Sequence, residues 1–422
     1  MTVRTGRHTL RRAAAPAGPR TGRRALLALI VGGLSSGGNL LLAITVTRLE
    51  SVTGLGQFAL AFSFYIVGSG LVRSTVTDSV LATGVGAVAS AARRAILLGA
   101  VVGTLICAAG VAYGSPYLLF VGLALPGLVL YDYTKAVAVG IGAPSAAMVQ
   151  EIAWAVLSAC AALAGLLRVI DVPYVFALWA GGGALIGLVA AARRGYALVP
   201  GWRVGRAETR VAAGFGAQFL LTTGSAQLAL TAVALVAGTA VVGALSAGRT
   251  LLGPVNLVLS TAATLILPQL ARTRAESRAV RTRTAVRLAL LVAAAVLPLT
   301  VAVALLPNAV GAELLGANWS HARSLLVLLA LESLLAVPAT IGFAGLRLEQ
   351  ASRRAIVLGA LLGGLRVPTV VAGAVLFGAP GAAGALVVLA LLSALAWGGS
   401  YLLLLRDRAA DRPPAVQPVQ PV

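Results

Sequence analysis

The sequence predicts an all-α membrane protein with about twelve transmembrane helices. Hydrophobic residues make up 59% of the 422 residues, charged residues make up 11%, and the mean hydropathy is +0.96. A water-soluble chain carries about 25% charged residues, so most of this protein must face lipid. The apolar runs are long and uninterrupted, whereas the strands of a membrane barrel alternate apolar and polar residues. An unpaired backbone N–H or C=O group in lipid has a large free-energy cost, and a helix pairs these groups within one segment. These runs must therefore be helices.

Twelve apolar runs are long enough to cross a bilayer, which takes about 20 residues. The first six are predicted at residues 25–47, 55–77, 95–113, 116–139, 147–167 and 172–192. The next six are predicted at residues 211–236, 240–268, 288–306, 324–344, 355–377 and 381–405. The longest connection, 193–210, is expected to be a cytoplasmic linker between an N-terminal lobe (25–192) and a C-terminal lobe (211–405).

The basic residues predict that both termini are cytoplasmic. With this orientation, 26 basic residues fall on the cytoplasmic side and only Arg48, Arg168 and Arg323 fall outside, as the positive-inside rule requires. The Arg-rich segment 1–24 and the Pro-rich segment 406–422 are expected to be disordered tails. Arginine outnumbers lysine 32 to 1, which indicates a high-G+C bacterial genome and hence a multi-pass protein of the inner membrane. The net charge of +21 therefore reflects topology, and no nucleic-acid partner is expected.

No pattern typical of an enzyme is found. His8 and His321 stand apart from any Cys or carboxylate cluster, so neither a metal site nor a resident cofactor is expected. Cys107 and Cys160 lie inside apolar runs and read as buried thiols. No Walker loop is present, so the chain is not expected to hydrolyse ATP. The sequence favours a transporter over an enzyme.

The two halves resemble each other in sequence. The stretch Gly54–Leu71 aligns with Ala240–Leu257 at a shift of 186–187 residues, which brings Gly56 opposite Gly243. An even number of spans precedes the second half, so the repeat is parallel, as in transporters built from two equivalent lobes.

Three segments resemble the polysaccharide flippases of the multidrug/oligosaccharidyl-lipid/polysaccharide exporter superfamily. Ile44–Ala82 is similar to that family's first helical hairpin, Tyr131–Pro144 to the end of its fourth helix, and Gly238–Arg272 to its eighth helix with a Leu-Pro before a basic loop. The chain departs from fourteen-span members in having twelve spans.

The resemblance implies a MATE-like fold, with two six-helix lobes around a central cavity that opens alternately to each side. It implies a polyprenyl-diphosphate-linked glycan as substrate, with the polymerase and glycosyltransferases of the same pathway as further partners. Two alternatives remain open: a cation-coupled multidrug exporter of the same superfamily, and a membrane-embedded glycan polymerase.

Four basic residues within spans are candidates for binding the diphosphate: Arg249, Arg366, Arg73 and Lys135. A charge at the bilayer centre is costly, and guanidinium is a bidentate partner of phosphate. Arg249 and Arg366 lie deepest, and we expect them to supply the charge that a shared cavity needs from both lobes. For Arg73 and Lys135 the alternative is snorkelling to the cytoplasmic headgroups.

Two acidic residues are candidates for coupling to H⁺ or Na⁺. Glu332 lies in mid-span without a local partner, whereas Asp132 has Lys135 three residues along the helix and is expected to pair with it. Asp78 and Glu151 are expected to mark cytoplasmic helix ends.

Polar residues in spans 1, 2, 7 and 8 are candidates for binding sugar hydroxyls, since in the family these helices face the cavity. They are Asn39, Gln57, Gln218, Gln227 and Asn256. The alternative for each is a hydrogen bond between helices.

Overall fold

The computed structural model describes residues 19–83, 88–202 and 205–410, and this part of the chain is helical without a strand. Eleven of its helical segments are long and apolar enough to cross a membrane. The last of these, Arg353–Arg406, has 54 residues and holds two crossings, because the backbone breaks at Gly378 with φ of 66°. That conformation is open to glycine without steric cost. The predicted all-α, polytopic architecture is confirmed.

The N-terminal lobe consists of seven consecutive helices and one π-helical turn. They are α1 (Pro19–Leu49), α2 (Val52–Val72), the turn η1 (Arg73–Thr77), α3 (Asp78–Thr83), α4 (Val88–Tyr113), α5 (Pro116–Gly140), α6 (Pro144–Leu166) and α7 (Val172–Arg193). Helix α5 forms the centre of this lobe and packs against α4, α7 and α2. A buried aromatic cluster that includes Phe58, Phe176 and Trp179 joins α2 to α7.

The C-terminal half contains the remaining helices. They are α8 (Arg206–Phe219), the π-helical turn η3 (Leu220–Gly224), α9 (Ser225–Val236), α10 (Thr239–Leu251), α11 (Gly253–Arg272), α12 (Arg278–Ala304), α13 (Asn308–Leu315), η4 (Gly316–Asn318), α14 (Trp319–Arg323), α15 (Leu326–Leu348), α16 (Ser352–Ser393), η5 (Ala394–Gly398) and α17 (Gly399–Ala410). The predicted span 240–268 is not one continuous helix, because the helix is interrupted at Leu252 between α10 and α11. Pro254, which has no backbone N–H to donate, follows the interruption directly.

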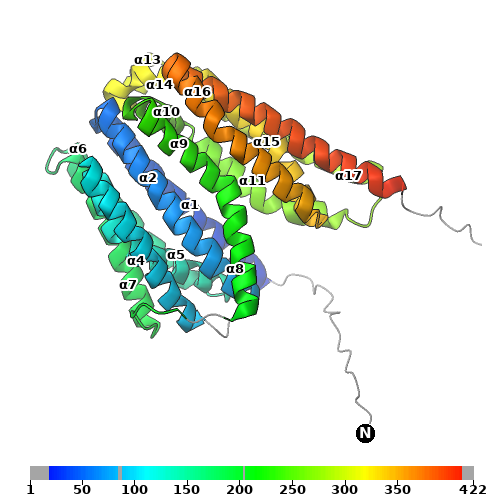
Figure 1. Cartoon of the computed structure of the whole chain (residues 1–422), viewed down its shortest axis with the longest axis horizontal. Helices are drawn as coiled ribbons and strands as arrows, with labels where there is room; N and C mark the ends of the chain where they lie inside the picture. Colours follow the sequence, from blue (N-terminus) through cyan, green and yellow to red (C-terminus); the bar gives the residue numbers. More distant parts are fainter. Residues whose placement is uncertain (1–18, 84–87, 203–204, 411–422) are drawn as a thin grey trace, which may run out of the picture.

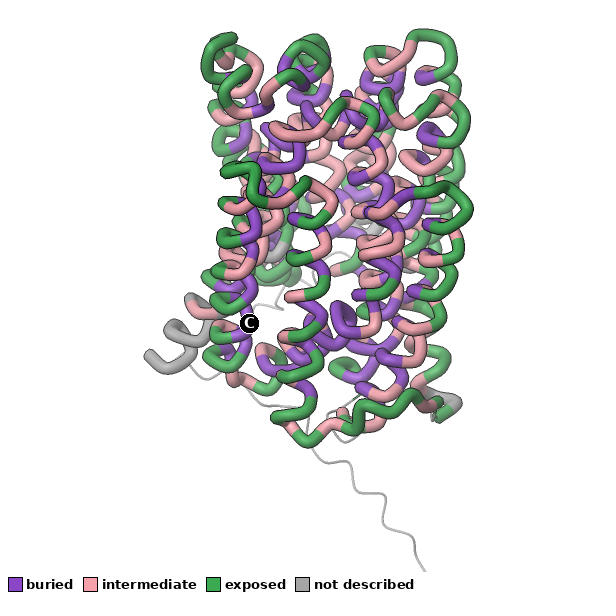
Figure 2. The backbone as a smooth tube through the Cα atoms, turned by 90° about the vertical axis from the view of Figure 1, so that its left-hand side faces the viewer, coloured by how far each residue is buried: buried purple, intermediate pink, exposed green. Residues whose placement is uncertain are grey.

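The two lobes form a V (Figure 1). Helices α4–α7 and helices α15–α17 diverge from the region of α10, α13 and α14, and the described chain begins and ends at the open end. The predicted tails fall mostly on residues 1–18 and 411–422, outside the described residues. Exposed positions follow the outside of the bundle along its length (Figure 2), and many are large and apolar, such as Leu105, Leu123 and Leu376. Such a surface suits lipid and not water.

At the apex of the V, α2 and α10 cross in contact through two glycines. A Cβ on Gly56 would lie 1.9 Å from the carbonyl oxygen of Thr239, and a Cβ on Gly243 would lie 1.9 Å from that of Val52. The two contacts are equivalent under the sequence repeat, since a shift of 187 residues relates both Gly56 to Gly243 and Val52 to Thr239. Only glycine permits backbones to approach this closely, so the apex is closed by a reciprocal glycine contact.

Polar contacts between the lobes surround this crossing. Thr47 and Thr250 share a hydrogen bond of 3.2 Å, and Asn318 donates to the carbonyl oxygens of Thr47 and Glu50 at 2.7 and 2.8 Å. Arg48 forms an ion pair of 2.7 Å with Glu313. Under the predicted topology this closure lies on the outer side, and the open end faces the cytoplasm.

A second contact between the halves runs along α8. Phe219 packs its ring against Gly70, and Gly216 lies against the side chain of Thr75. Arg94, whose side chain is 3% exposed, forms an ion pair with Glu208. Helix α8 therefore closes the seam beside α2 and α3, although it follows the linker in sequence.

The topology predicts which positions react from outside. In a variant with Cys107 and Cys160 replaced by serine, Val169→Cys should react with a membrane-impermeant thiol reagent in intact cells, because residue 169 is 72% exposed in a predicted outer loop. Ser277→Cys, exposed in a predicted cytoplasmic loop, should react only after permeabilisation. Reversed labelling would overturn the orientation.

The reciprocal glycine contact predicts that a single methyl group opens the apex. Gly56→Ala and Gly243→Ala should each force α2 and α10 apart and raise the external labelling rate of a cysteine at the cavity residue Ser246. Gly181→Ala is the matched control, since nothing lies within 4 Å of a Cβ there. Equal labelling in all three variants would show that this crossing does not hold the closure.

Candidate functional site

A cavity of about 630 Å³ lies between α1 and α2 on one side and α9, α10 and α11 on the other. Its polar lining comes from both lobes: Ser36, Asn39, Ser63, Gln227, Ser246, Arg249, Thr250, Asn256 and Ser260. Phe58 and Phe62 add aromatic surface on the N-terminal side. We call this space the central cavity. Among the described residues that line it, Arg249 is the only one with a charge, and none is a carboxylate.

The interrupted helix brings Arg249 to the cavity wall. Arg249 lies in the last turn of α10, and Gly253, Pro254 and Asn256 lie in the first turn of α11, beside the same cavity. The start of α11 adds little positive charge, because Pro254 has no backbone N–H, the Asn256 N–H donates to the carbonyl oxygen of Leu252, and the C-terminal end of α10 lies one residue away. The guanidinium of Arg249 is therefore the group that makes this wall favourable for an anion.

Glu332 of α15 forms an ion pair with Arg249. The Arg249 Nη2 lies 3.2 Å from Oε1 of Glu332, and the two side chains are 33% and 24% exposed. A second space of about 280 Å³, lined by Arg249, Asn256, Glu332 and Ser333, continues from the central cavity into the C-terminal lobe. Glu332 is expected to lack a local partner along its own helix, and the partner that the structure gives it, Arg249, comes from a helix that is distant in sequence.

Arg366 of α16 is the second guanidinium in this region. It lies within electrostatic range of both Glu332 and Arg249, but it lines neither space, and no carboxylate among the described residues is within 4 Å of it. The two guanidiniums and one carboxylate leave the interior of this lobe with net positive charge. The expectation that Arg249 and Arg366 supply charge from both lobes is wrong, since both belong to the C-terminal lobe.

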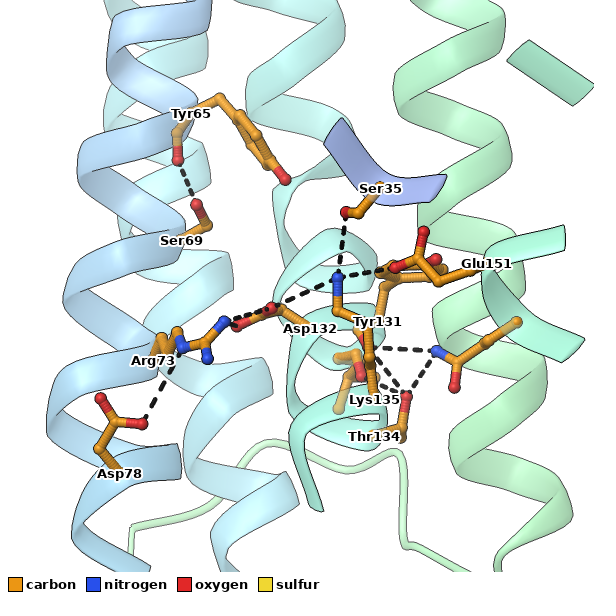
Figure 3. A network of polar contacts seen from close by, with 12 residues as sticks. Ser35, Tyr65, Ser69, Arg73, Asp78, Tyr131, Asp132, Thr134, Lys135 and Glu151 are labelled. Carbon is orange, nitrogen blue, oxygen red and sulfur yellow. Dashed lines mark hydrogen bonds and ion pairs between the residues drawn. The ribbon is translucent and has the colours of Figure 1, made fainter. Parts of the chain in front are cut away.

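The other in-span charges form a network inside the N-terminal lobe (Figure 3). Lys135 Nζ lies 2.7 Å from Oε1 of Glu151 and 3.4 Å from Oγ of Ser35. Arg73 Nη1 lies 3.0 Å from Oδ1 of Asp132, and the Arg73 Nε lies 3.9 Å from Oδ1 of Asp78. Lys135 also lies above the ring of Tyr131, 5.2 Å from its centroid. The network joins α1, η1, α3, α5 and α6.

This network corrects two expectations about acidic residues. Asp132 lies 3.9 Å from Lys135, but its closer partner is Arg73, so the local helix pair is the weaker contact. Glu151 was expected at a cytoplasmic helix end, yet its side chain is 2% exposed within α6, against Lys135. Glu151 and Ser35 were missed as members of this site. Glu151 was the only one with a signal in the sequence, being a carboxylate within an apolar run.

The structure brings only some of the predicted binding residues together. Asn39, Gln227, Arg249 and Asn256 line the central cavity, and the backbone carbonyl of Gln227 also accepts a hydrogen bond of 3.4 Å from Ser63. The remaining candidates do not line the cavity: Arg73, Lys135, Arg366, Gln57 and Gln218. Gln57 and Gln218 are half-buried on α2 and α8.

Comparison with solved structures identifies the fold. The chain is similar to an inward-facing multidrug-resistance MATE transporter of the MOP superfamily, with a TM-score of 0.69, 15% identity, and coverage of 91% of this chain and 99% of the other. For an outward-facing MATE transporter of that superfamily the TM-score is 0.58, with 15% identity and coverage of 94% and 97%. For the lipid II flippase MurJ in an inward closed conformation it is 0.67, with 8% identity and coverage of 92% and 90%.

No protein-family model matches the sequence. No curated protein matches it either. At 8–15% identity, the structural likeness establishes the MATE-like fold, as expected from the sequence.

The buried pair Lys135–Glu151 predicts a large loss of stability when one partner is removed. Glu151→Gln leaves the ammonium group without its nearest carboxylate, and breaking such a pair costs about 3–5 kcal/mol. The double variant Lys135→Met/Glu151→Gln should recover most of this loss. Unfolding of the purified protein in detergent, followed by circular dichroism, measures both.

Glu313→Gln is the control for that measurement, since its side chain is 74% exposed and pairs with Arg48 at the surface. Exposed pairs contribute about 0–1 kcal/mol. If Glu151→Gln lowered the stability no more than Glu313→Gln, the network would not support the N-terminal lobe.

Proposed function

We propose that this chain is a flippase that moves a polyprenyl-diphosphate-linked oligosaccharide across the bacterial inner membrane by alternating access, for the assembly of a surface polysaccharide. The observation that carries this proposal is the charge of the central cavity. Among the described residues that line it, Arg249 has the only charge and carboxylates are absent. A diphosphate is an anion that guanidinium binds in a bidentate manner, so the cavity suits this head group.

The size and lining of the cavity support a bulky polar cargo. About 630 Å³ is typical of a pocket for a small molecule, so a head group and its first sugars fill it. The hydroxyl and amide side chains that line it, among them Asn39, Gln227 and Asn256, offer donors and acceptors to sugar hydroxyls. The polymerase and glycosyltransferases of the same pathway would be its partners.

The fold is shared with transporters of both kinds, since one similar structure is a multidrug MATE transporter and another is the lipid II flippase MurJ. A site for cationic drugs calls for acidic residues facing the cargo. Glu332 forms an ion pair with Arg249, and Asp132 forms one with Arg73. Neither carboxylate lines the central cavity. The cavity charge therefore favours an anionic cargo over a cationic drug, and coupling to H⁺ or Na⁺ through either acid stays a prediction.

Replacement of Arg249 tests the proposal directly. Arg249→Ala should reduce the flipping of a diphosphate-linked glycan by at least about tenfold, because the only cation on the cavity wall is lost. Arg249→Lys should keep part of the activity, since a point charge remains while the bidentate geometry is lost. Vesicles that contain the purified protein and a polyprenyl-diphosphate-linked glycan, probed with an external lectin, measure the rate.

Arg323→Ala is the matched control, since it also removes one arginine, but at an exposed position at the end of α14 that does not line the cavity. Its rate should equal that of the unaltered protein. In cells, deletion of the gene should leave the lipid-linked precursor on the cytoplasmic leaflet and reduce the surface polymer. Intact surface polymer together with new sensitivity to cationic dyes would instead support drug export, and full activity of Arg249→Ala would overturn the diphosphate assignment.

A further inference from the structure

An apolar groove adjoins the central cavity along helix α1, at an edge that the two spaces share. The groove has a volume of about 460 Å³ and is lined by Ile30, Gly33, Leu34, Gly37, Gly38 and Leu41 of α1 together with Ala155 of α6. Gly33 and Gly37 line both the groove and the central cavity. No side chain that lines the groove is polar. We call this space the α1–α6 groove.

From this geometry we propose that the α1–α6 groove holds the isoprenoid tail of the substrate while the diphosphate lies in the central cavity at Arg249. The inference rests on the proposed function and adds to it the path of the lipid tail. A charged head in the cavity and a tail in the bilayer require an apolar path from one to the other. The α1–α6 groove meets the cavity across the backbone of two glycines, so it provides this path.

The glycines of α1 are not explained by helix packing. At Gly33, Gly37 and Gly38 a Cβ would meet nothing within 4 Å, whereas at Gly56 and Gly243 it would collide with a neighbouring backbone. Glycine stabilises a helix less than alanine does. In membrane proteins, glycine within a helix usually allows a second helix to pack closely against it. Here the missing side chains leave open space instead, and that space is the groove.

The opposite seam between the lobes offers no such path. Beside α2, Phe219 covers Gly70 and Gly216 lies against Thr75, so side chains fill the boundary there. The α1 side is the one on which the cavity and an apolar groove share a wall.

The position of the groove favours the substrate's own tail over a phospholipid chain. A phospholipid acyl chain can enter the groove, but a phospholipid carries no diphosphate for Arg249 to bind in the central cavity at the same time. An isoprenoid diphosphate is drawn there by its head, because the charge of Arg249 complements the diphosphate. The occupant that fits both spaces is thus one molecule with an anionic head and a long hydrocarbon tail.

Photo-crosslinking tests the inference. The probe is a polyprenyl diphosphate with a photoreactive group at the far end of the isoprenoid chain, added to the purified full-length protein in lipid nanodiscs. Mass spectrometry should find the label on α1 or α6, at the residues of the groove. Gly38→Leu and Ala155→Leu each fill the groove without altering a residue of the central cavity, and each should reduce this labelling by about tenfold.

Two matched controls lie on the same helices. In Gly32→Leu the new side chain also points into open space, but residue 32 lines neither the groove nor the cavity. In Ala153→Leu the new side chain is at an exposed position of α6. Both should be labelled like the unaltered protein. Labelling that the filling variants leave unchanged would overturn the inference. So would equal labelling of the same residues by a phosphatidylglycerol with the photoreactive group at the end of an acyl chain, because the groove would then be an ordinary lipid contact.

A failure of the inference can be told apart from a failure of the proposed function. Arg249→Ala should weaken the binding of the probe, and excess inorganic diphosphate should compete with it in the unaltered protein. If neither had an effect while the groove were still labelled, the diphosphate site would be wrong and the tail site would stand. If both had an effect while the label appeared elsewhere, the diphosphate site would stand and the tail site would be wrong.

Discussion

The crossing of α2 and α10 is the contact on which the rest of the structure depends. Gly56 and Gly243 bring two backbones together at the apex of the V, and this fixes the positions of both lobes at one end. With the apex closed and α8 docked beside α2, the space that remains between the lobes is the central cavity. The repeat explains the contact, since α2 and α10 are equivalent helices that meet about an approximate two-fold axis. Gly56 of α2 contacts the backbone of α10, and Gly243 of α10 contacts the backbone of α2.

The cost of charge in lipid accounts for the arrangement of the other ionic residues. Lys135 and Glu151 pair inside the N-terminal lobe, Arg73 pairs with Asp132, and neither pair lines the central cavity. These pairs join η1, α5 and α6, and the opposite charges neutralise one another. In the C-terminal lobe, Glu332 pairs with Arg249, and Arg366 has no carboxylate among the described residues within 4 Å. This difference in charge between the lobes is the basis of the proposal that the cargo is an anion.

The proposed cargo is complementary to surfaces from both lobes. One lobe supplies a cationic wall at the broken helix α10–α11, and the other supplies Asn39, Ser63 and two phenylalanines. Gly33 and Gly37 of α1 line both the cavity and the apolar α1–α6 groove. An amphiphile whose head is anionic, whose next segment is polar and whose tail is hydrocarbon matches these three surfaces in turn. A cation or a purely hydrophobic molecule would match one of them at most.

The sequence by itself determined the architecture, because hydropathy and the distribution of arginine act along the chain. The all-α class, most of the spans and the equivalence of Gly56 and Gly243 follow from residue order alone. The tertiary structure decided which side chains meet. Glu151 reaches Lys135 from another helix, Glu332 reaches Arg249 across 83 residues, and of five polar candidates only Asn39, Gln227 and Asn256 line the cavity. The physical reason is that a helix in lipid exposes several faces, and only its packing against other helices fixes which face borders the cavity.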